Sequence, residues 1–548
     1  MLPQTLSLLL AAAAGCANAQ SALPVIDLGT TVHRAQLNAT GAYYSFKNIP
    51  YAEPPVGNLR FRLPLPRLTI NRTINDGNAP RVCPSAGQGW FQYSLPLVIE
   101  TLIKGGIIPP DGGFVPGTTP QSEDCLLLDI NVPKAVYDAQ VAGTLTKRAP
   151  VMIWIHGGAY TSGSKDDINP AGLIAQSRRN AGDLGVIVIG INYRLGLFGF
   201  PPRTPWIWDV ASNAGLYDQR LAMEWVRLNI RRFGGDPNAI TVIGESAGAG
   251  SIVSHLSAFG GIDGTSPFKR AIIQSPAIKP AQDQTLNTQL YQQLLAMSNA
   301  TSYSDLRAMP TEQLQGINAA IVGTAPFASS VFGPIVDGLL IPSNPGTLLS
   351  HGVVDKSVEI IVAHNFAEGL LFTDPRVSDQ AGFEAYLSGL MPSLPQAKIK
   401  TLSQTVYPPD YSGAQPYTTP VQRTSLAIAE GLINCFAWGI NQAYANNTRG
   451  YQWSVFPGIH AGDVAYTFFN GESVGGFGVP IARDAAVKMQ QWFVDFAAKG
   501  TAAGSAAAEL PVYGSAANVV NITGAGFPVV RDPAANSRCR FWMEGLTA

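Results

Sequence analysis

The sequence predicts an α/β fold in which helices cover both faces of a central, mostly parallel sheet. Short β-rich runs recur along the chain with helical patterns between several of them, as expected of parallel strands buried on both sides. A second observation is Gly244-Glu-Ser-Ala-Gly248, a sharp turn between an apolar run and a stretch of small residues. At 548 residues the chain is long for one domain, so we expect a single domain with insertions over the sheet.

Apolar runs bounded by turn residues predict the strands. They lie at residues 151–155, 186–191, 240–243, 271–273 and 359–363, after strand-and-turn patterns at 25–32 and 41–46. Apolar residues at helical spacing predict a helix over 216–233, which Gly234 ends, and another across the apolar positions from Met489 to Phe496. From about residue 280 to 350 the pattern changes to polar, short helices, which indicates a cap insertion.

The composition and the N-terminus bound the class of protein. Charged residues make up 13% of the chain and the net charge is −1, so no basic surface is expected to hold nucleic acid. Residues 1–19 combine a short apolar run with Ala17-Asn-Ala19, the pattern of a secretory signal peptide and its cleavage site. We therefore expect a secreted, extracellular protein whose single domain spans residues 20–548. No later apolar run reaches membrane-spanning length.

Cysteines and glycosylation motifs agree with secretion. Removal of the signal peptide also removes Cys16, which leaves an even number of cysteines in an oxidising compartment and predicts two disulfides. The remaining cysteines are Cys83, Cys125, Cys435 and Cys539. The Asn-x-Ser/Thr motifs that predict glycosylation begin at Asn38, Asn71, Asn299, Asn446 and Asn521.

Ser246 has the surroundings of a catalytic nucleophile. A predicted strand comes before Gly244-Glu-Ser-Ala-Gly248 and a predicted helix follows, the context in which a G-x-S-x-G turn presents its serine. Side chains at the flanking glycines would collide with the neighbouring strand or helix. The serine hydroxyl is therefore expected to point away from the sheet, at the positive end of the helix.

Elimination among six histidines predicts the base and the acid that Ser246 needs. In this type of fold the chain order is serine, acid, histidine, and His460 lies downstream of a strand-like run at 451–456. Glu368 follows the predicted strand 359–363, where the acid belongs, and His460 is the histidine downstream of it. A second possibility pairs Asp337 with His351 or His364, although Asp337 also fits a turn residue.

The transition state also needs donors for the negative oxygen that develops on the carbonyl. His156-Gly-Gly-Ala-Tyr160 directly follows the strand predicted at 151–155, where a backbone oxyanion loop belongs. Gly158 and Ala159 are the predicted donors, with the N–H of Ala247 as a third. A plain Gly-Gly turn is the alternative for this segment.

The segment 83–125 is rich in apolar residues and could form a lid or a pocket wall over an apolar site. A lid would provide a contact with a lipid interface, whereas ordinary packing against the core is the alternative. Trp90 in this segment could also serve as a cation–π platform for a choline-like substrate.

Together these motifs resemble the type-B carboxylesterase/lipase family of the α/β-hydrolase superfamily, which includes carboxylesterases, cholinesterases and fungal lipases. The resemblance covers nearly all of the mature chain and is carried by Phe233–Gly248, Glu123-Asp-Cys-Leu126, Tyr51–Gly57, Asn192–Gly196, Gly215–Gln219 and Gln274-Ser275. It implies a Ser246–Glu368–His460 triad, the disulfides Cys83–Cys125 and Cys435–Cys539, and the ion pairs Arg60–Glu123 and Arg194–Asp218. The chain departs from the family at Leu127, at Ala159 and in lacking the middle disulfide of cholinesterases; no role follows for Ser275.

The predicted activity is hydrolysis of a small-molecule or lipid carboxylic ester through an acyl-enzyme, with no metal and no cofactor. A lipase or sterol esterase is the main alternative, and a cholinesterase is another. A catalytically inactive adhesion protein of the same fold would lack a triad residue, and none is missing here. The oligomeric state and the acyl and alcohol groups of the substrate are left open.

Overall fold

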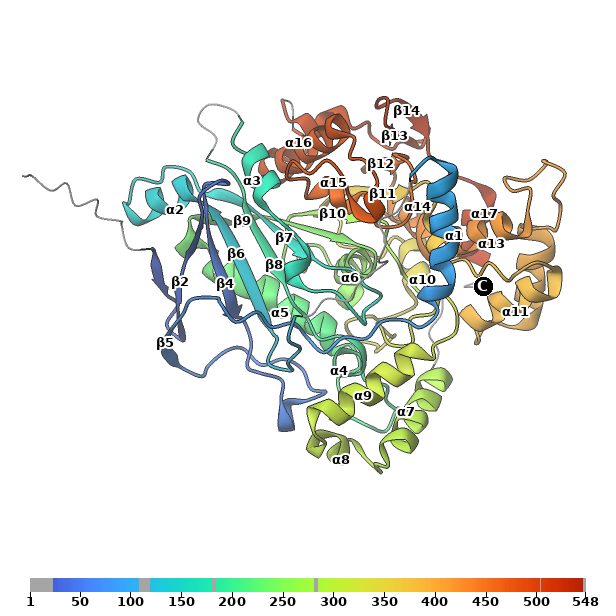
Figure 1. Ribbon diagram of the computed structural model, residues 1–548, viewed down its shortest axis with the longest axis horizontal. Coiled ribbons are helices and arrows are strands. Elements are labelled where there is room, and N and C mark those ends of the chain that lie inside the picture. Colours follow the sequence, from blue (N-terminus) through green and yellow to red (C-terminus); the bar gives the residue numbers. More distant parts are fainter. Residues whose placement is uncertain (1–22, 108–118, 180–183, 280–283, 503, 546–548) are drawn as a thin grey trace, which may run out of the picture.

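The computed structural model describes residues 23–107, 119–179, 184–279, 284–502 and 504–545 (Figure 1). Within these residues eleven strands form one sheet in the order β14-β13-β12-β11-β10-β9-β7-β8-β6-β4-β3, and β1, β2 and β5 form a small second sheet. The strands from β8 through β13 are parallel, and β3, β4, β6 and β14 run antiparallel at the two edges. The strand bounds are β1 Val25–Asp27, β2 Thr31–Arg34, β3 Gln36–Asn38, β4 Tyr43–Pro50, β5 Asn71–Asn75, β6 Leu127–Pro133, β7 Ala149–Ile155, β8 Ile187–Ile191, β9 Gly235–Glu245, β10 Arg270–Gln274, β11 Glu359–Asn365, β12 Arg449–Trp453, β13 Asn518–Ile522 and β14 Val529–Arg531.

Helices occupy both sides of the sheet and the connections between strands. Their bounds are α1 Phe91–Lys104, α2 Lys134–Val141, α3 Ala171–Gln176, α4 Gly196–Gly199, α5 Ala214–Asn229, α6 Ala247–Leu256, α7 Gln284–Ser298, α8 Tyr303–Ala308, α9 Thr311–Gly323, α10 Pro345–Ser350, α11 Gln380–Leu390, α12 Gln396–Thr401, α13 Pro420–Ala429, α14 Cys435–Ala443, α15 Val464–Thr467, α16 Arg483–Lys499 and α17 Ser537–Arg540. No helix among the residues described above is both long and apolar enough to cross a membrane.

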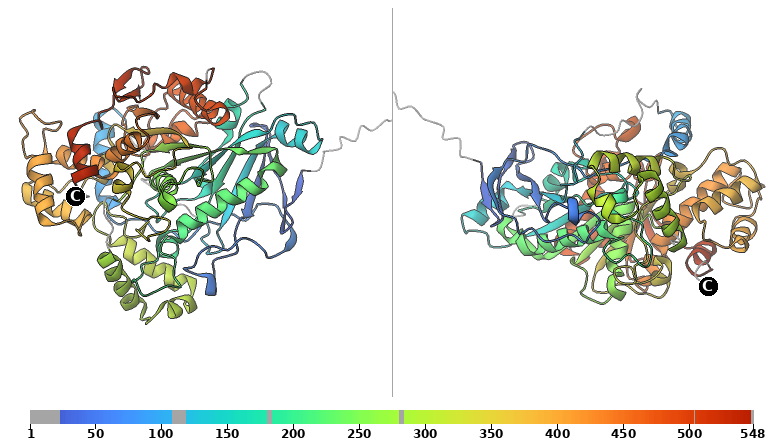
Figure 2. Two further views of the ribbon diagram at one scale, coloured as in Figure 1. Left: turned by 180° about the vertical axis from the view of Figure 1, so that it is seen from behind. Right: turned by 90° about the horizontal axis from the view of Figure 1, so that it is seen from below.

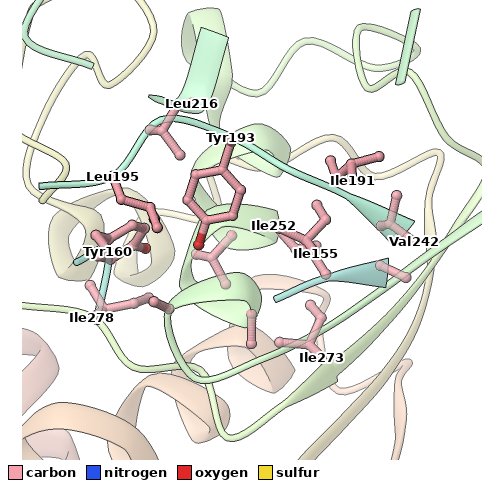
Figure 3. Packing of buried hydrophobic residues seen from close by; sticks show 14 of the residues in the cluster. Ile155, Tyr160, Ile191, Tyr193, Leu195, Leu216, Val242, Ile252, Ile273 and Ile278 are labelled. Carbon is pink, nitrogen blue, oxygen red and sulfur yellow. The ribbon is translucent and has the colours of Figure 1, made fainter. Parts of the chain in front are cut away.

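The side chains of the central strands alternate between the two faces of the sheet, and both faces are covered by apolar cores. In β7, Met152 and Trp154 pack in the core that includes α3 and α16, whereas Val151 and Ile153 pack in the larger core that includes α5 and α6. Successive side chains of a strand point to opposite faces, so an apolar run without polar interruptions requires cover on both. Figure 3 shows the larger core close by, with Val242 of β9 and Ile252 of α6 in the same cluster. The predicted fold class is confirmed.

Turns and caps account for most differences between predicted and observed bounds. The run predicted at 25–32 is divided into β1 and β2 by a turn at Gly29, whose φ of 90° favours glycine. The helix predicted over 216–233 is α5, which tightens to a 3₁₀ turn over Ile230–Phe233 and ends at Gly234 in the left-handed region. Local periodicity identifies these elements, whereas their last turns depend on packing.

The two regions predicted as insertions contain helices. Between residues 284 and 350 lie α7, α8, α9 and α10, and Figures 1 and 2 show α7, α8 and α9 as a group at one side of the molecule. The segment 83–125 contains α1, whose Val98 and Leu102 pack against Ile459. The signal peptide predicted at 1–19 and the turn-rich part of the predicted lid, residues 108–118, lie outside the described residues.

Candidate active site

Ser246 sits at the sharp turn between β9 and α6. Its backbone has φ 56° and ψ −122°, a strained conformation for a residue with a side chain. A Cβ at Gly244 would lie 2.7 Å from the carbonyl carbon of Gly248, and a Cβ at Gly248 would lie 2.0 Å from the Ile155 carbonyl oxygen. Glycine is therefore required on both sides of Ser246 for the turn to close against β7.

His460 and Glu368 are brought to Ser246 by the loops that follow β12 and β11. His460 Nε2 is 2.8 Å from Ser246 Oγ, and His460 Nδ1 is 2.6 Å from Glu368 Oε2. The other oxygen of Glu368 accepts the N–H of Asn365 at 2.5 Å. The Asn365 side chain in turn donates to the carbonyl of Ile459 at 2.7 Å, which ties the two loops together. All three predicted side chains are thus in one hydrogen-bonded chain.

A second carboxyl group, Glu245, lies beside the same imidazole. Its Oε1 is 3.3 Å from His460 Nε2, and burial raises the pKa of Glu245 to about 8 against the opposing effect of His460. Burial also raises the pKa of Glu368, but the contact with His460 outweighs it and holds this pKa below its ordinary value. Burial lowers the pKa of His460, but Glu245 and Glu368 raise it to about 9.

Glu245 and Glu368 thus both favour the charged form of His460. The neutral imidazole is the form whose Nε2 can accept the hydroxyl proton of Ser246. No local pattern in the sequence assigns a role to Glu245, because its position beside His460 depends on a loop more than two hundred residues downstream. Its place inside the G-x-S-x-G turn was the available clue.

The predicted oxyanion loop follows β7 and packs against the turn at Ser246. Gly158 and Ala159 have positive φ values of 102° and 54°, and a Cβ at Gly157 would lie 2.8 Å from the Glu245 carbonyl oxygen. Within the described residues the N–H groups of Gly158, Ala159 and Ala247 have no hydrogen-bond acceptor. Ala159 and Ala247 line the same cavity as Ser246, so their N–H groups are available to an oxygen bound there.

An apolar cavity leads to Ser246. Trp90 lines it and packs against Phe327 and Phe372 at ring-centroid distances of 5.4 and 5.9 Å. The indole N–H of Trp90 donates to the Ser329 carbonyl at 3.2 Å. Trp90 is therefore part of the cavity wall.

The alternative acid and histidines lie elsewhere. Asp337 accepts the N–H groups of Leu339 and Ile341 and so stabilises a turn. His364 pairs with Asp532 at 2.9 Å, and the ring of His351 faces the Thr347 carbonyl in its own helix. Neither histidine is paired with Asp337.

Two further side chains near the site were not assigned from the sequence. Ser275 is fully buried with a φ of 50°, and its hydroxyl contributes to lowering the pKa of Glu368. Asp463 is fully buried and accepts hydrogen bonds from Tyr451 at 2.7 Å and from Gln274 at 2.8 Å. Among the described residues no group of histidine, cysteine and acidic side chains is arranged to hold a metal ion.

The disulfides and ion pairs that the family resemblance implies are present in the structure. The structure contains disulfides between Cys83 and Cys125 and between Cys435 and Cys539. The resemblance also implies two ion pairs, and both are present and buried, Arg60–Glu123 at 2.5 Å and Arg194–Asp218 at 2.7 Å.

Comparisons with known proteins agree on the family. The model of the carboxylesterase family matches residues 28–542. Carboxylesterase patB of Aspergillus clavatus is 36% identical and that of Penicillium expansum 34%, each alignment covering 95% of this chain and 96% of the relative. Lipase 5 of Diutina rugosa is 33% identical over 69% of this chain and 68% of its own length. The crystal structure of Aspergillus niger EstA superposes with a TM-score of 0.76 at 24% identity, covering 95% of this chain and 98% of that one. The chain therefore belongs to the carboxylesterase family of carboxylic ester hydrolases.

Proposed function

We propose that this chain is a secreted serine esterase in which Ser246 is the nucleophile, His460 the general base and Glu368 the acid that orients the histidine. The observation that carries the proposal is the continuous hydrogen-bonded chain from Ser246 Oγ through both nitrogens of His460 to Glu368. An alcohol hydroxyl is a poor nucleophile near neutral pH, and this arrangement is the one that activates it.

The reaction follows from the positions of these groups. Ser246 Oγ attacks the ester carbonyl carbon while its proton moves to His460 Nε2. The carbonyl oxygen becomes negative and accepts N–H groups from Gly158, Ala159 and Ala247, each worth about 3 kcal/mol of barrier. The intermediate expels the alcohol, which takes the proton from His460 and leaves an acyl group on Ser246. Water then attacks this acyl group and gives a proton to His460, which passes it to Ser246 Oγ as the bond between that oxygen and the acyl carbon breaks and the carboxylic acid departs.

Covalent labelling tests the nucleophile directly. Diisopropyl fluorophosphate should add one phosphoryl group to Ser246, which peptide mass spectrometry locates, and Ser246→Ala should lose both the label and turnover of p-nitrophenyl esters. Ser257→Ala is a matched control, because Ser257 follows α6 directly and its hydroxyl bonds the Val253 carbonyl away from the cavity. A label on another serine in the wild-type protein would contradict the assignment.

Long-chain lipid esters are the second candidate substrate, favoured by the position of α1. The outer face of this helix exposes Tyr93 and Ile103, at 49% and 58%, while Leu102 on its inner face contacts Ile459 beside His460. Such a helix could meet a lipid surface. A lipase would show a rise in rate when a triglyceride exceeds its solubility limit, whereas a plain esterase would lose activity as the acyl chain of soluble p-nitrophenyl esters lengthens.

Secretion is supported by the two disulfides and by the secreted lipases of Botryotinia fuckeliana and Gibberella zeae among the relatives. Among the predicted glycosylation sites, Asn71 and Asn299 are exposed. Protein recovered from the medium of an expressing fungus should begin at Gln20, as N-terminal sequencing would show. It should also lose mass on treatment with a peptide N-glycosidase. Retention inside the cell with residues 1–19 intact would contradict secretion.

A further inference from the structure

The cavity that leads to Ser246 contains a cation that the esterase mechanism does not use. Lys279 lines this cavity among Trp90, Ile278, Ile335 and other largely apolar residues. It is the one charged side chain among the described residues that line the cavity. An ammonium group in such surroundings is costly unless an anion or a hydrogen-bond acceptor compensates it.

The chain before Lys279 is fixed to the elements that carry the nucleophile. The N–H of Ala277 donates to the Ser246 carbonyl at 3.2 Å, and the N–H of Ile278 donates to the Leu432 carbonyl at 3.0 Å. A Cβ at Gly250 would lie 2.4 Å from the Ala277 carbonyl oxygen, so α6 lies directly against this segment. Figure 3 shows Ile278 within the same packed cluster as Ile252 of α6. Lys279 is therefore held near the reacting centre by backbone contacts.

The Lys279 side chain is half-buried. Within the parts of the chain that the structure describes, its ammonium has no ion pair and no hydrogen-bond partner. Burial lowers its pKa to about 8. The lysine is still mostly protonated at neutral pH and would regain a full charge beside an anion.

Lys279 also lines a second cavity that adjoins the first. Both cavities share Ser329, Gly333, Ile335 and Leu390 with Lys279, and the second extends towards Leu286 and Phe332. Lys279 is again the one charged side chain among the described residues that line it. A substrate reaching from Ser246 past Ser329 would thus meet apolar walls, backbone and hydroxyl groups, and one cation.

From this placement we infer that the preferred substrate is an ester that carries a carboxylate, which Lys279 recognises while the ester carbonyl lies at Ser246. The inference rests on the proposed esterase function and names the substrate class of the same site. Carboxylate and ammonium form a charge-assisted hydrogen bond, strong where water is excluded. A neutral ester of the same length would leave the lysine without a partner. We therefore expect a higher kcat/KM for the ester that carries a carboxylate than for the neutral ester.

Paired substrates test the inference. The monomethyl esters of the dicarboxylic acids from glutaric to sebacic acid carry a free carboxylate, and their dimethyl esters are neutral controls of nearly equal size. At the best chain length the wild-type protein should hydrolyse the half-ester with a kcat/KM at least about tenfold higher than the diester. In Lys279→Met this ratio should fall to about 1, and Lys279→Arg should restore much of it. Lys400→Met, which removes an exposed ammonium from α12 outside both cavities, should keep the wild-type ratio.

A binding measurement separates this inference from the proposed function. Calorimetry with Ser246→Ala and monomethyl suberate needs no turnover, and adding Lys279→Met should weaken the affinity by about tenfold or more. A wild-type ratio near 1 at every chain length, or equal affinities with and without Lys279, would overturn the inference even if ester hydrolysis is found. Absence of hydrolysis of all esters, together with lysine-dependent binding, would instead contradict the proposed function and support the anion site.

Discussion

Replacement of Glu368 by glutamine should place the wrong tautomer of His460 against the nucleophile. Glu368 Oε1 accepts the Asn365 N–H at 2.5 Å, and an amide NH₂ cannot accept that hydrogen bond. The amide oxygen of the substituted side chain must therefore face Asn365, which turns its NH₂ towards His460 Nδ1. The proton of His460 then moves to Nε2, which faces Ser246 Oγ at 2.8 Å and can no longer accept the hydroxyl proton.

We expect a large loss of kcat from Glu368→Gln. The substitution keeps the geometry of the site but places the imidazole proton of His460 on the wrong nitrogen. The corresponding replacement of the triad aspartate by asparagine in a serine protease lowers kcat by about 10⁴, which corresponds to about 5 kcal/mol of barrier. The assay is kcat with a short p-nitrophenyl ester, together with the thermal unfolding midpoint, which should stay near the wild-type value. Asp337→Asn is the matched control, since Asp337 serves a turn, and its kcat should stay close to wild type. A folded Glu368→Gln protein with kcat within tenfold of wild type would refute the reasoning.

Two further changes probe the turn at Ser246. Glu245→Gln removes the carboxyl group that raises the pKa of His460, so this pKa should fall and the acidic limb of the kcat/KM profile should move to lower pH by about one unit. An unchanged limb would show that Glu245 does not affect the charge of His460. Gly248→Ala places a Cβ 2.0 Å from the Ile155 carbonyl oxygen and should lower the free energy of unfolding by about 3 kcal/mol in urea titrations. In Gly316→Ala of α9 the new Cβ meets no atom within 4 Å, so this control should be slightly stabilised, and a similar loss in both variants would contradict the steric argument.

The local pattern of the sequence was sufficient for the central strands β7 to β12 and for the chain order of the site residues, but β6, β13 and β14 were not predicted. The apolar runs within β7 and β11 are uninterrupted because both faces of the sheet are covered, and each is recognisable within a strand of 7 residues. The turn at Ser246 could be predicted from its local motif, in which Gly244 is required by its contact with Gly248, whereas the contact that requires Gly248 is made with Ile155 of β7. The scarcity of histidine then limited the choice to His460, whose side chain the structure brings to Ser246.

Other features of the site depend on contacts between distant segments, which no local pattern encodes. The effect of Glu245 on the pKa of His460 requires the β12 loop to place an imidazole 3.3 Å from a buried carboxyl. The position of Lys279 has the same origin, because desolvation in the cavity comes from residues between Trp90 and Leu432.

The sequence by itself thus determined the central strands, the turn at Ser246 and the chain order of the site residues, because these depend on periodicity and on a local motif. Tertiary structure alone decided which carboxyl groups face His460 and, among the described residues, which cation in the cavity has no partner. Burial and distance set the energy of a charge, and both are fixed when segments far apart in the chain come together.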